Sequence, residues 1–295
     1  MKNIAFIINP ISGTQQNAKR KLPKLIDKEL DHTQWLPNIV FTEYAGHATE
    51  LARQFAVMGF DAVVAVGGDG TVNEVAQGLR DTQTALAILP MGSGNGFARH
   101  MNIPMQPARA IQLLNHSEPI RCDYGLANDK LFVTTCGTGF DAQIADRFAN
   151  SKKRGFKTYI ENVVKDLLTY KSQTYHIVGQ DIDITHKAFL ITFANAAQWG
   201  NDAFIAPKAS VQDGKMDICM MSSSALLGAP GLALRLFTKS IDNSLFMDTI
   251  KAKEVMLYRE EEAPFHIDGD PVKMPKDIHI RIVEDGISVL VEKRF

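Results

Sequence analysis

The sequence is poor in cysteine. Its 295 residues include three cysteines, Cys122, Cys136 and Cys219, which are widely spaced and form no C-x-x-C pair. Such spacing predicts neither a disulfide framework nor a thiolate metal site. We interpret the three thiols as small core residues of a protein in a reducing compartment.

The sequence also lacks a strong net charge and a long apolar run. The formal net charge is −1, so no global field indicates nucleic acid as a partner. The apolar run Ile4–Ile8 is too short for a signal peptide and ends at Asn9-Pro10. The apolar stretch Ala225–Phe237 is interrupted by Pro230 and Arg235 and cannot span a bilayer. We therefore expect a globular cytoplasmic protein with no transmembrane segment.

One glycine cluster stands out against this ordinary composition. Gly67-Gly68-Asp69-Gly70-Thr71 follows the apolar run Val63–Val66 and precedes a helical pattern that ends at Leu79. Glycines let backbone N–H groups approach an anion, and a helix N-terminus adds a favourable dipole. The cluster lacks the Lys-Ser/Thr pair that ends a P-loop and the glycine spacing of the G-x-G-x-x-G pattern. What sets it apart is the acid Asp69 inside the glycine cluster. It is either a phosphate-binding turn with a cation or catalytic task for Asp69, or an ordinary turn with a capping acid.

The first half of the chain alternates strands and helices. The predicted strands are Ile4–Ile8, Ile39–Thr42, Ala62–Val66 and Ala85–Leu89, and the predicted helices are Ala18–Leu30, His47–Met58 and Thr71–Leu79. Continuous apolar strands separated by helices predict a parallel sheet covered on both faces. Ligands bind such sheets at the C-terminal strand ends. Four polar turns should meet there: Asn9–Gly13, the turn after Thr42, Gly67–Asn73 and Pro90–Gly96.

The second half is rich in short β-like runs. A strand is predicted over Leu131–Cys136 and an amphipathic helix over Thr158–Tyr170, followed by a series of strands punctuated by Asp-Gly pairs. Asp285-Gly286 lies between two alternating runs, Ile278–Val283 and Ile287–Val291, which predicts a hairpin. We expect an α/β domain over residues 1–124 and a β-sandwich domain over residues 125–295, whose last strand could return to the first domain.

Several stretches coincide, in chain order, with one family. They are NPISG from Asn9, GGDGTVNEV from Gly67, PMGSGNGFAR from Pro90, DYG from Asp123, GTGFD from Gly137, APKASVQDGKMD from Ala206 and HIDGDP from His266. The chain resembles the soluble lipid kinases of the diacylglycerol kinase and sphingosine kinase type, especially their bacterial members. The resemblance implies an N-terminal α/β domain similar to those of NAD kinase and phosphofructokinase, a C-terminal β-sandwich, and an active site in the cleft between them.

The resemblance also implies roles for individual residues. Asp69 matches an acidic active-site residue acting through Mg²⁺, Asp123 a supporting acid, and Asp270 the general base for the lipid hydroxyl. A structural Mg²⁺ would be held by the carboxylate of Asp213 and the carbonyls of Ser210 and Lys215, which are hard oxygen ligands. The implied ATP contacts are Asn9, Pro10, Ser12, Gly13, Thr42, Gly67, Gly68, Asp69, Gly70, Thr71, Val72, Asn73 and Ser93.

The chain departs from the family pattern at several of these positions. Asp270 stands where the family usually has a glutamate, which has one more methylene. Thr14-Gln15 stands where many bacterial relatives have a lysine, and Gly96 where many diacylglycerol kinases have an acid. Lys215 replaces an apolar residue beside the expected metal ligand Asp213.

The resemblance leads us to expect an ATP-dependent lipid kinase that converts diacylglycerol to phosphatidic acid at a membrane surface, with ATP and Mg²⁺. A sphingoid base is a second candidate acceptor, favoured by Gly92–Gly96. An NAD kinase-like or phosphofructokinase-like enzyme would share the glycine turn, and a non-catalytic nucleotide-binding module would fit the departures at Asp270 and Thr14-Gln15. We expect no nucleic-acid partner, and a homodimer is among the states that the sequence allows.

Overall fold

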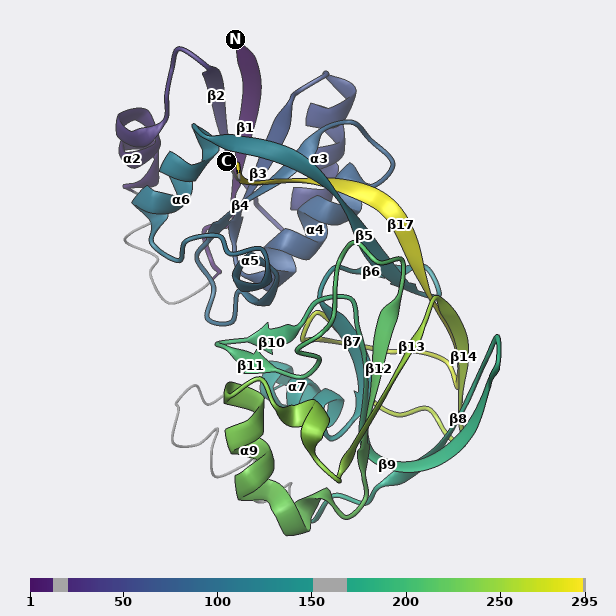
Figure 1. Cartoon of the computed structure of the whole chain (residues 1–295). Coiled ribbons are helices and arrows are strands. Elements are labelled where there is room, and N and C mark those ends of the chain that lie inside the picture. Colours follow the sequence, from purple (N-terminus) through teal and green to yellow (C-terminus); the bar gives the residue numbers. More distant parts are fainter. Residues whose placement is uncertain (13–20, 151–168, 294–295) are drawn as a thin grey trace. The chain divides into compact units, whose positions relative to one another are not determined.

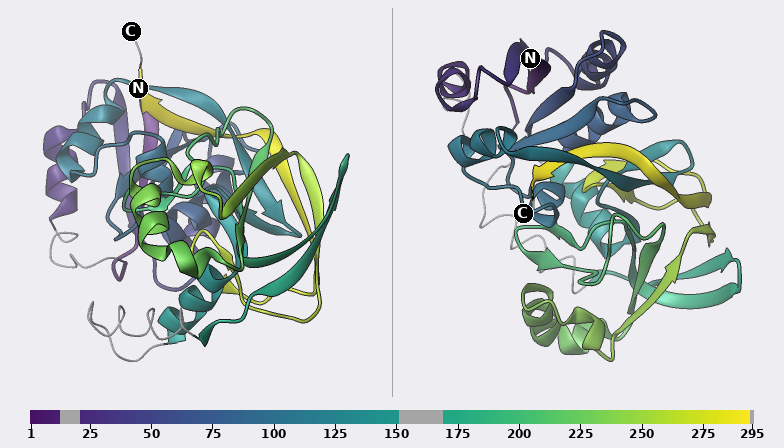
Figure 2. Two further views of the ribbon diagram at one scale, coloured as in Figure 1. Left: turned by 60° about the horizontal axis from the view of Figure 1, so that its bottom comes forward. Right: turned by 45° about the horizontal axis from the view of Figure 1, so that its top comes forward.

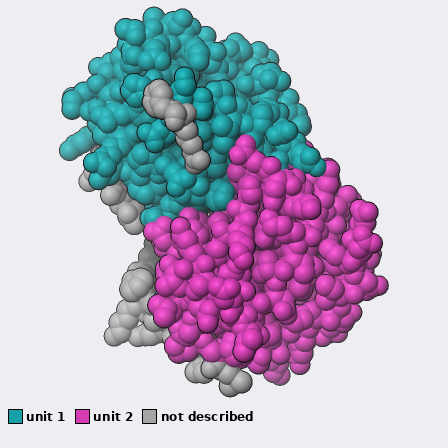
Figure 3. All heavy atoms as spheres, in the orientation of Figure 1, with its two compact units in different colours: residues 1–124, 284–295 teal, residues 125–283 magenta. Residues whose placement is uncertain are grey.

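The computed structural model describes residues 1–12, 21–150 and 169–293. The chain divides into two compact units: unit 1 is Met1–Tyr124 with Glu284–Phe295, and unit 2 is Gly125–Val283 (Figure 3). Four features named above lie wholly or partly outside the described residues: Gly13 at the end of the first predicted turn, the Thr14-Gln15 pair, the start of the helix predicted from Ala18 and most of the helix predicted over Thr158–Tyr170.

Unit 1 is built on a parallel sheet. Its strands follow the spatial order β2-β1-β3-β4 and are β1 (Lys2–Ile8), β2 (Trp35–Phe41), β3 (Ala62–Gly67) and β4 (Ala85–Pro90). The helices α2 (Leu22–Glu29) and α6 (Pro107–Leu114) lie together on one face, and α3 (His47–Val57) and α4 (Asp69–Leu79) lie together on the other (Figure 1). The predicted α/β architecture with parallel strands is confirmed. The strands are continuous apolar runs because both of their faces are buried.

Unit 2 is an antiparallel β structure. Its long strand β9 (Ile182–Ala194) pairs with β8 through its first half and with β7 and β12 through its second half, so it connects two parts of one large sheet (Figure 2). The other strands are β6 (Lys130–Phe132), β7 (Thr135–Gly139), β8 (Gln173–Gly179), β10 (Gln198–Gly200), β11 (Ala203–Phe204), β12 (Met216–Ser222), β13 (Met247–Ala252), β14 (Glu254–Arg259), β15 (Phe265–Ile267) and β16 (Asp270–Val272). The helical elements are α7 (Phe140–Asn150), η1 (Ala225–Gly228), α9 (Ala229–Phe237) and η2 (Ile241–Asn243).

Side chains of β12 alternate between two apolar clusters. Ile218 and Met220 face one buried cluster, and Cys219 and Met221 face a second, which also contains Leu232 of α9. This period of two is what a strand with both faces buried requires. The three cysteines are buried and unpaired, and burial raises the pKa of the Cys122 and Cys219 thiols to about 12. Their interpretation as core residues is confirmed.

The hairpin predicted at Asp285-Gly286 is wrong. The strand β17 (Asp277–Glu292) continues through this pair: its first part pairs antiparallel with β14, and Val289 pairs parallel with Leu86 of β4. Asp285 has a positive φ of 50°, which kinks the strand without reversing it. The kink is held by β5 (Ser117–Ala127), where the Asp123 carboxylate accepts the Asp285 N–H (2.9 Å) and the Arg121 guanidinium donates to the Asp285 carbonyl.

The strand predicted over Leu131–Cys136 is interrupted. The structure has β6 and β7 there, separated by Val133 and Thr134. Their backbone N–H groups donate to the carboxylate of Asp268 (3.0 Å and 2.8 Å) and not to a neighbouring strand. A side-chain acceptor distant in sequence therefore divides one apolar run into two strands.

No helix in the described part of the chain is long and apolar enough to cross a membrane.

A glycine in α4 allows α3 to pack closely against it. A Cβ at Gly78 would lie 2.5 Å from the Thr49 carbonyl oxygen and 2.7 Å from the Ala52 Cβ. Gly231 in α9 has no atom within 4 Å of the corresponding position. The two glycines therefore form a matched pair, one sterically required and one not.

We expect Gly78→Ala and Gly231→Ala to change stability in opposite directions. An exposed helical glycine replaced by alanine gains about 1 kcal/mol from helix propensity. At Gly78, overpacking should cost about 1–3 kcal/mol more than that gain. Denaturant midpoints should rise for Gly231→Ala and fall for Gly78→Ala, and stabilisation by Gly78→Ala would contradict the close packing of α3 on α4.

Candidate active site

The turns after the four parallel strands of unit 1 are joined by hydrogen bonds. The Thr42 N–H donates to the Ile8 carbonyl (2.9 Å), and the Asn9 N–H donates to the Val66 carbonyl (3.1 Å). The Met91 N–H donates to the Gly67 carbonyl (2.7 Å). Because the strands are parallel, all these bonds lie at the C-terminal ends of the strands, where ligands bind α/β sheets. The sheet topology therefore brings the four predicted turns to one edge.

The glycine cluster is a close contact between two turns. A Cβ at Gly92 would lie 2.4 Å from the Gly68 Cα, and a Cβ at Gly67 would lie 2.3 Å from the Thr71 Oγ1. A larger residue at Gly92 would push the two turns apart, and a larger residue at Gly67 would displace the Thr71 side chain. The helix α4 begins at once, with the Val72 N–H donating to the Gly68 carbonyl (3.1 Å). The N–H groups of Gly70 and Thr71 lie in the first helical turn, where helix geometry supplies no acceptor.

Asp69 fixes the neighbouring loop. Its carboxylate accepts the N–H of Asn95 at Oδ2 (2.8 Å) and the N–H of Gly96 at Oδ1 (2.7 Å). Gly96 begins the short helix α5 (Gly96–His100), so the carboxylate also lies at a positive helix terminus. The Asn95 side chain in turn accepts the Gly92 N–H (3.0 Å) and donates to the Gly92 carbonyl (2.9 Å). Asp69 thus holds the Gly92–Gly96 loop against the glycine turn.

Glu74, on the same helix, makes an equivalent contact with α3. Its two carboxylate oxygens accept the N–H groups of Gly46 (2.9 Å) and Ala48 (3.2 Å) at the start of α3. Sequence reasoning did not single out Glu74. The signal available was its place in GGDGTVNEV, but its partners lie 26 and 28 residues away along the chain.

Asn9 organises the turn after β1. Its side-chain oxygen accepts the N–H groups of Ile11 (3.1 Å) and Ser12 (3.2 Å), and its amide donates to Thr71 Oγ1 (3.2 Å). This asparagine turn ties the first predicted motif to the glycine turn.

The remaining predicted nucleotide contacts differ in exposure. Pro10 and Ser93 are exposed, Ser12 and Asn73 are partly buried, and Thr42 and Val72 are buried. Gly13 lies outside the described residues. Asp123 is 2% exposed and lies on β5, where it holds the β17 kink.

In unit 2 the predicted base Asp270 lies on a true hairpin. Asp268 and Gly269 both have positive φ (48° and 86°), as a tight two-residue turn between β15 and β16 requires. Asp270 follows directly and is exposed. The turn is anchored by Asp268, whose carboxylate accepts three backbone N–H groups, those of Val133, Thr134 and Thr135 (2.8–3.0 Å).

A buried histidine–aspartate pair lies next to this hairpin. His266 on β15 is 3% exposed, and its Nε2 contacts Asp141 Oδ2 at 3.1 Å. Asp141 lies in the first turn of α7 and also accepts the Thr192 hydroxyl (3.2 Å). His266 Nδ1 is buried without a partner among the described residues. His266 and Asp270 share HIDGDP, but His266 pairs across the hairpin with Pro271 and Asp270 with Ile267, which places them on opposite faces.

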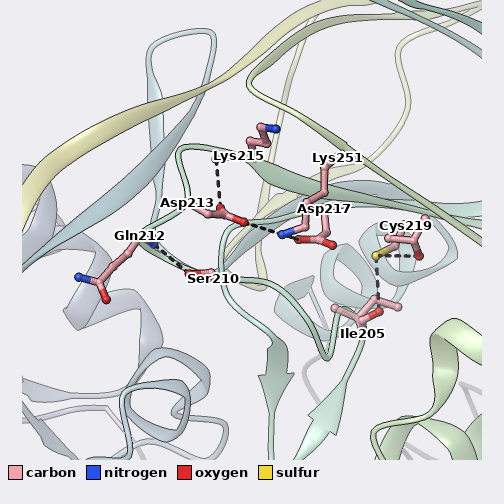
Figure 4. A network of polar contacts seen from close by, with 9 residues as sticks. Ile205, Ser210, Gln212, Asp213, Lys215, Asp217, Cys219 and Lys251 are labelled. Atoms are coloured by element: carbon pink, nitrogen blue, oxygen red, sulfur yellow. Dashed lines mark hydrogen bonds and ion pairs between the residues drawn. The ribbon is translucent and has the colours of Figure 1, made fainter.

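The predicted metal ligands form a polar network with a lysine (Figure 4). Lys251 Nζ lies 2.6 Å from Asp213 Oδ2 and 3.3 Å from Asp217 Oδ2, and the Lys215 N–H donates to Asp213 Oδ1 (3.2 Å). Burial raises the pKa of the Asp217 carboxyl, while the two carboxylates outweigh partial burial and raise the pKa of Lys251. Ser210 accepts the Gln212 N–H through its hydroxyl (3.2 Å).

A positive charge thus already lies between the two acids, and both Asp213 oxygens carry N–H donors. The described residues contain no group of three or more His, Cys, Asp or Glu side chains placed to hold a metal ion. The Asp213 carboxylate, the expected metal ligand, is engaged by the Lys251 ammonium and by the Lys215 N–H.

Comparison with known proteins assigns the chain to a family. Residues 3–127 match the diacylglycerol kinase catalytic domain, and residues 134–291 match the YegS C-terminal NAD kinase beta sandwich-like domain. The chain belongs to the YegS-like lipid kinase family. The resemblance inferred from the motifs is confirmed, and with it a phosphotransferase that acts on an alcohol group.

The similarity to known relatives extends over most of the chain. A probable lipid kinase YegS-like of Pseudomonas putida is 30% identical over 219 residues, covering 70% of this chain and 74% of the relative. Another of Yersinia enterocolitica is 25% identical and covers 98% of this chain and 96% of the relative. The crystal structure of a putative diacylglycerol kinase from Bacillus anthracis is similar in fold, with a TM-score of 0.78, 24% identity, and coverage of 98% and 96%.

The two capping carboxylates of α4 can be tested against each other. Asp69→Ala should speed hydrogen exchange at the Asn95 and Gly96 amides at least about tenfold, because each N–H loses its acceptor. The Gly46 and Ala48 amides should keep their protection. Glu74→Ala should produce the reverse pattern. If Asp69→Ala left the Asn95 and Gly96 amides protected, its carboxylate would not be what holds the loop.

The lysine at the predicted metal site gives a second prediction. Lys251→Met should lower stability by about 1–3 kcal/mol, because the buried Asp217 carboxylate loses its counter-charge. Added Mg²⁺ should raise the thermal midpoint of Lys251→Met but not that of the wild type. Lys215→Met, which removes an exposed lysine from the same loop, is the control and should resemble the wild type. A wild-type midpoint that rises with Mg²⁺ and falls with chelator would show a resident cation.

Proposed function

We propose that this protein transfers the γ-phosphate of ATP to the hydroxyl of a membrane lipid, with diacylglycerol as acceptor and phosphatidic acid as product. The proposal is supported by the structure of the C-terminal edge of the parallel sheet, together with the membership of the chain in this family. There, two turns meet closely at Gly68 and Gly92, and α4 opens with N–H groups in its first turn. Such an edge can bind the phosphates of a nucleotide through backbone donors and the helix dipole.

The residues proposed from the motifs to contact ATP contribute to the site in different ways. Gly67 and Gly68 supply close backbone approach, Gly70 contributes an N–H in the first turn of α4, and Thr71 is held by Asn9 through its hydroxyl. Asp69 positions the Gly92–Gly96 loop that carries Ser93, so it shapes the site as well as adding charge to it. Pro10, Ser12, Gly13, Thr42, Val72 and Asn73 complete the proposed ATP-binding set. Phosphoryl transfer depends mainly on such positioning and on electrostatic stabilisation.

Asp270 is proposed as the general base. Its carboxylate accepts the proton of the lipid hydroxyl as that oxygen forms its bond to the γ-phosphorus, and ADP leaves with the β–γ bridging oxygen. The position suits this task because Asp270 is exposed while its hairpin is anchored by the carboxylate of Asp268. A base on a fixed hairpin needs little reorganisation to meet its substrate. Asp123 is proposed to support the site by holding the β17 kink.

We propose that Mg²⁺ enters this reaction with ATP as the MgATP substrate. At the site expected for a structural ion, the Lys251 ammonium already pairs with both Asp213 and Asp217. The catalytic need for a divalent cation and the stability of the Asp213 loop are therefore separate in this chain.

A lipid panel with labelled ATP tests the proposed reaction. The wild type should phosphorylate diacylglycerol, and Asp69→Ala should abolish turnover because the loop carrying Ser93 is released. Asp270→Asn should lower kcat by about 10²–10⁴, the usual contribution of a general base. Asp270→Glu restores the carboxylate and should stay within about tenfold of the wild type. Asp248→Asn is the control, since Asp248 is another exposed strand aspartate of unit 2.

The same panel separates the competing functions. Turnover of a sphingoid base in place of diacylglycerol would change the acceptor but keep the reaction. Transfer to NAD or a sugar phosphate alone, or tight ATP binding without turnover, would overturn the lipid kinase proposal. Full activity in Asp270→Asn would remove Asp270 as the base.

A further inference from the structure

The helix α9 presents an apolar face to solvent. The outward positions Pro230, Ala233, Leu234 and Phe237 follow the i, i+3, i+4, i+7 spacing of one helix face, and all four are exposed. Leu234 is 65% exposed and Phe237 is 59% exposed. A surface helix of a globular protein ordinarily has charged or polar residues on its solvent-facing side, whereas this side of α9 is apolar.

The inner face of α9 is apolar as well. Leu232 is buried in a cluster with Ile241 and Ala225, and Leu236 packs against this cluster. The exposed side chains are therefore not needed to seat the helix on unit 2. Leu245, just after η2, is fully exposed (100%) and adds a further apolar side chain to the segment. Contiguous exposed apolar residues of this kind mark interaction surfaces.

The charge of this segment has one sign. From residue 218 to residue 241 the sequence has no Asp or Glu, while Arg235 and Lys239 are basic. Lys239 is exposed, with its ammonium 4.4 Å from the centre of the Phe204 ring. The next acid, Asp242, is neutralised by an ion pair with Lys208 (2.7 Å). The surface thus combines exposed apolar side chains with positive charge.

We propose that the face of α9 formed by Pro230, Ala233, Leu234 and Phe237, together with Leu245, docks on the surface of an anionic lipid bilayer. Apolar side chains flanked by basic residues are the composition of helices that lie in a membrane interface. With nine residues, α9 is too short to cross a bilayer. Docking would bring unit 2 to the phase in which a lipid acceptor is found, and in this respect it rests on the proposed function.

The charge pattern favours a lipid surface over a second copy of the chain. A two-fold interface through α9 would place the positive charge of two copies in one contact, because an isologous contact uses the same patch on both copies. Anionic headgroups would instead neutralise these cations. The view of α9 in Figure 1 shows the helix on the outside of unit 2.

Vesicle flotation tests the proposal without requiring catalysis. The wild type should bind vesicles of phosphatidylcholine with about 30% phosphatidylglycerol. The double variant Leu234→Ser/Phe237→Ser should bind about tenfold or more weakly, since it lacks two exposed apolar side chains that the bilayer would bury. Lys239→Gln should weaken binding about fivefold on these vesicles and leave binding to pure phosphatidylcholine unchanged. Leu245→Ser, outside the helix, should weaken binding in the same direction.

The control is Val57→Ser/Met58→Ser, which removes two exposed apolar side chains (84% and 72% exposed) at the end of α3. It should bind vesicles as the wild type does. Equal binding by the wild type and Leu234→Ser/Phe237→Ser, or no binding by either, would overturn the proposal. So would a wild-type dimer that this variant converts to a monomer, without any vesicle binding.

The lipid kinase assay separates this inference from the proposed function. A short-chain diacylglycerol dispersed without vesicles should be phosphorylated equally by the wild type and Leu234→Ser/Phe237→Ser. Diacylglycerol in vesicles should be phosphorylated more slowly by the variant than by the wild type. Vesicle binding through α9 by a protein that phosphorylates no lipid would support the docking surface and refute the kinase proposal. Equal turnover of vesicle-borne diacylglycerol by both proteins would refute the docking surface alone.

Discussion

The organisation of unit 1 depends on carboxylates that bind the backbone N–H groups of other segments. Helix α4 carries two of them. Asp69 holds the start of α5, and Glu74 holds the start of α3. Each acid satisfies donors that a helix N-terminus leaves without an internal acceptor, and each lies where the helix dipole favours negative charge. One helix therefore sets the position of two others, and the glycine turn at its beginning is held in place by the same contacts.

Unit 2 uses the same device in a β setting. Asp268 accepts three successive N–H groups at the break between β6 and β7, and this fixes the hairpin that carries Asp270. Asp270, the proposed base, thus lies beside an acid, Asp268, that has a structural role. Asp268 and Asp270 are two residues apart in HIDGDP. Asp268 anchors the hairpin, whereas Asp270 has an exposed carboxylate. The distinction between a catalytic and a supporting acid in such motifs follows from where each side chain's hydrogen bonds go.

Local pattern predicted the buried strands of the parallel sheet but not the contacts between residues distant in the sequence. Continuous apolar runs predicted β1, β3 and β4 because burial on both faces leaves no other composition. The two Asp-Gly pairs show the limit of such reasoning. Asp268-Gly269 turns the chain, whereas Asp285-Gly286 kinks a strand that continues, and the difference lies in Asp123, 162 residues from Asp285. Lys251 is likewise 38 residues from Asp213, so no local pattern could predict the ion pair between them.

The course of β17 has a consequence for the order in which the two units can complete their folding during synthesis. Val289 pairs with Leu86, so the β4 edge of the parallel sheet receives a neighbour from residues that leave the ribosome after all of unit 2. During synthesis, residues 1–124 must wait with that strand edge unpaired while unit 2 emerges. An unpaired edge strand is a hazard for aggregation, and domains usually fold as they emerge. In this chain the unit that begins synthesis first is completed last.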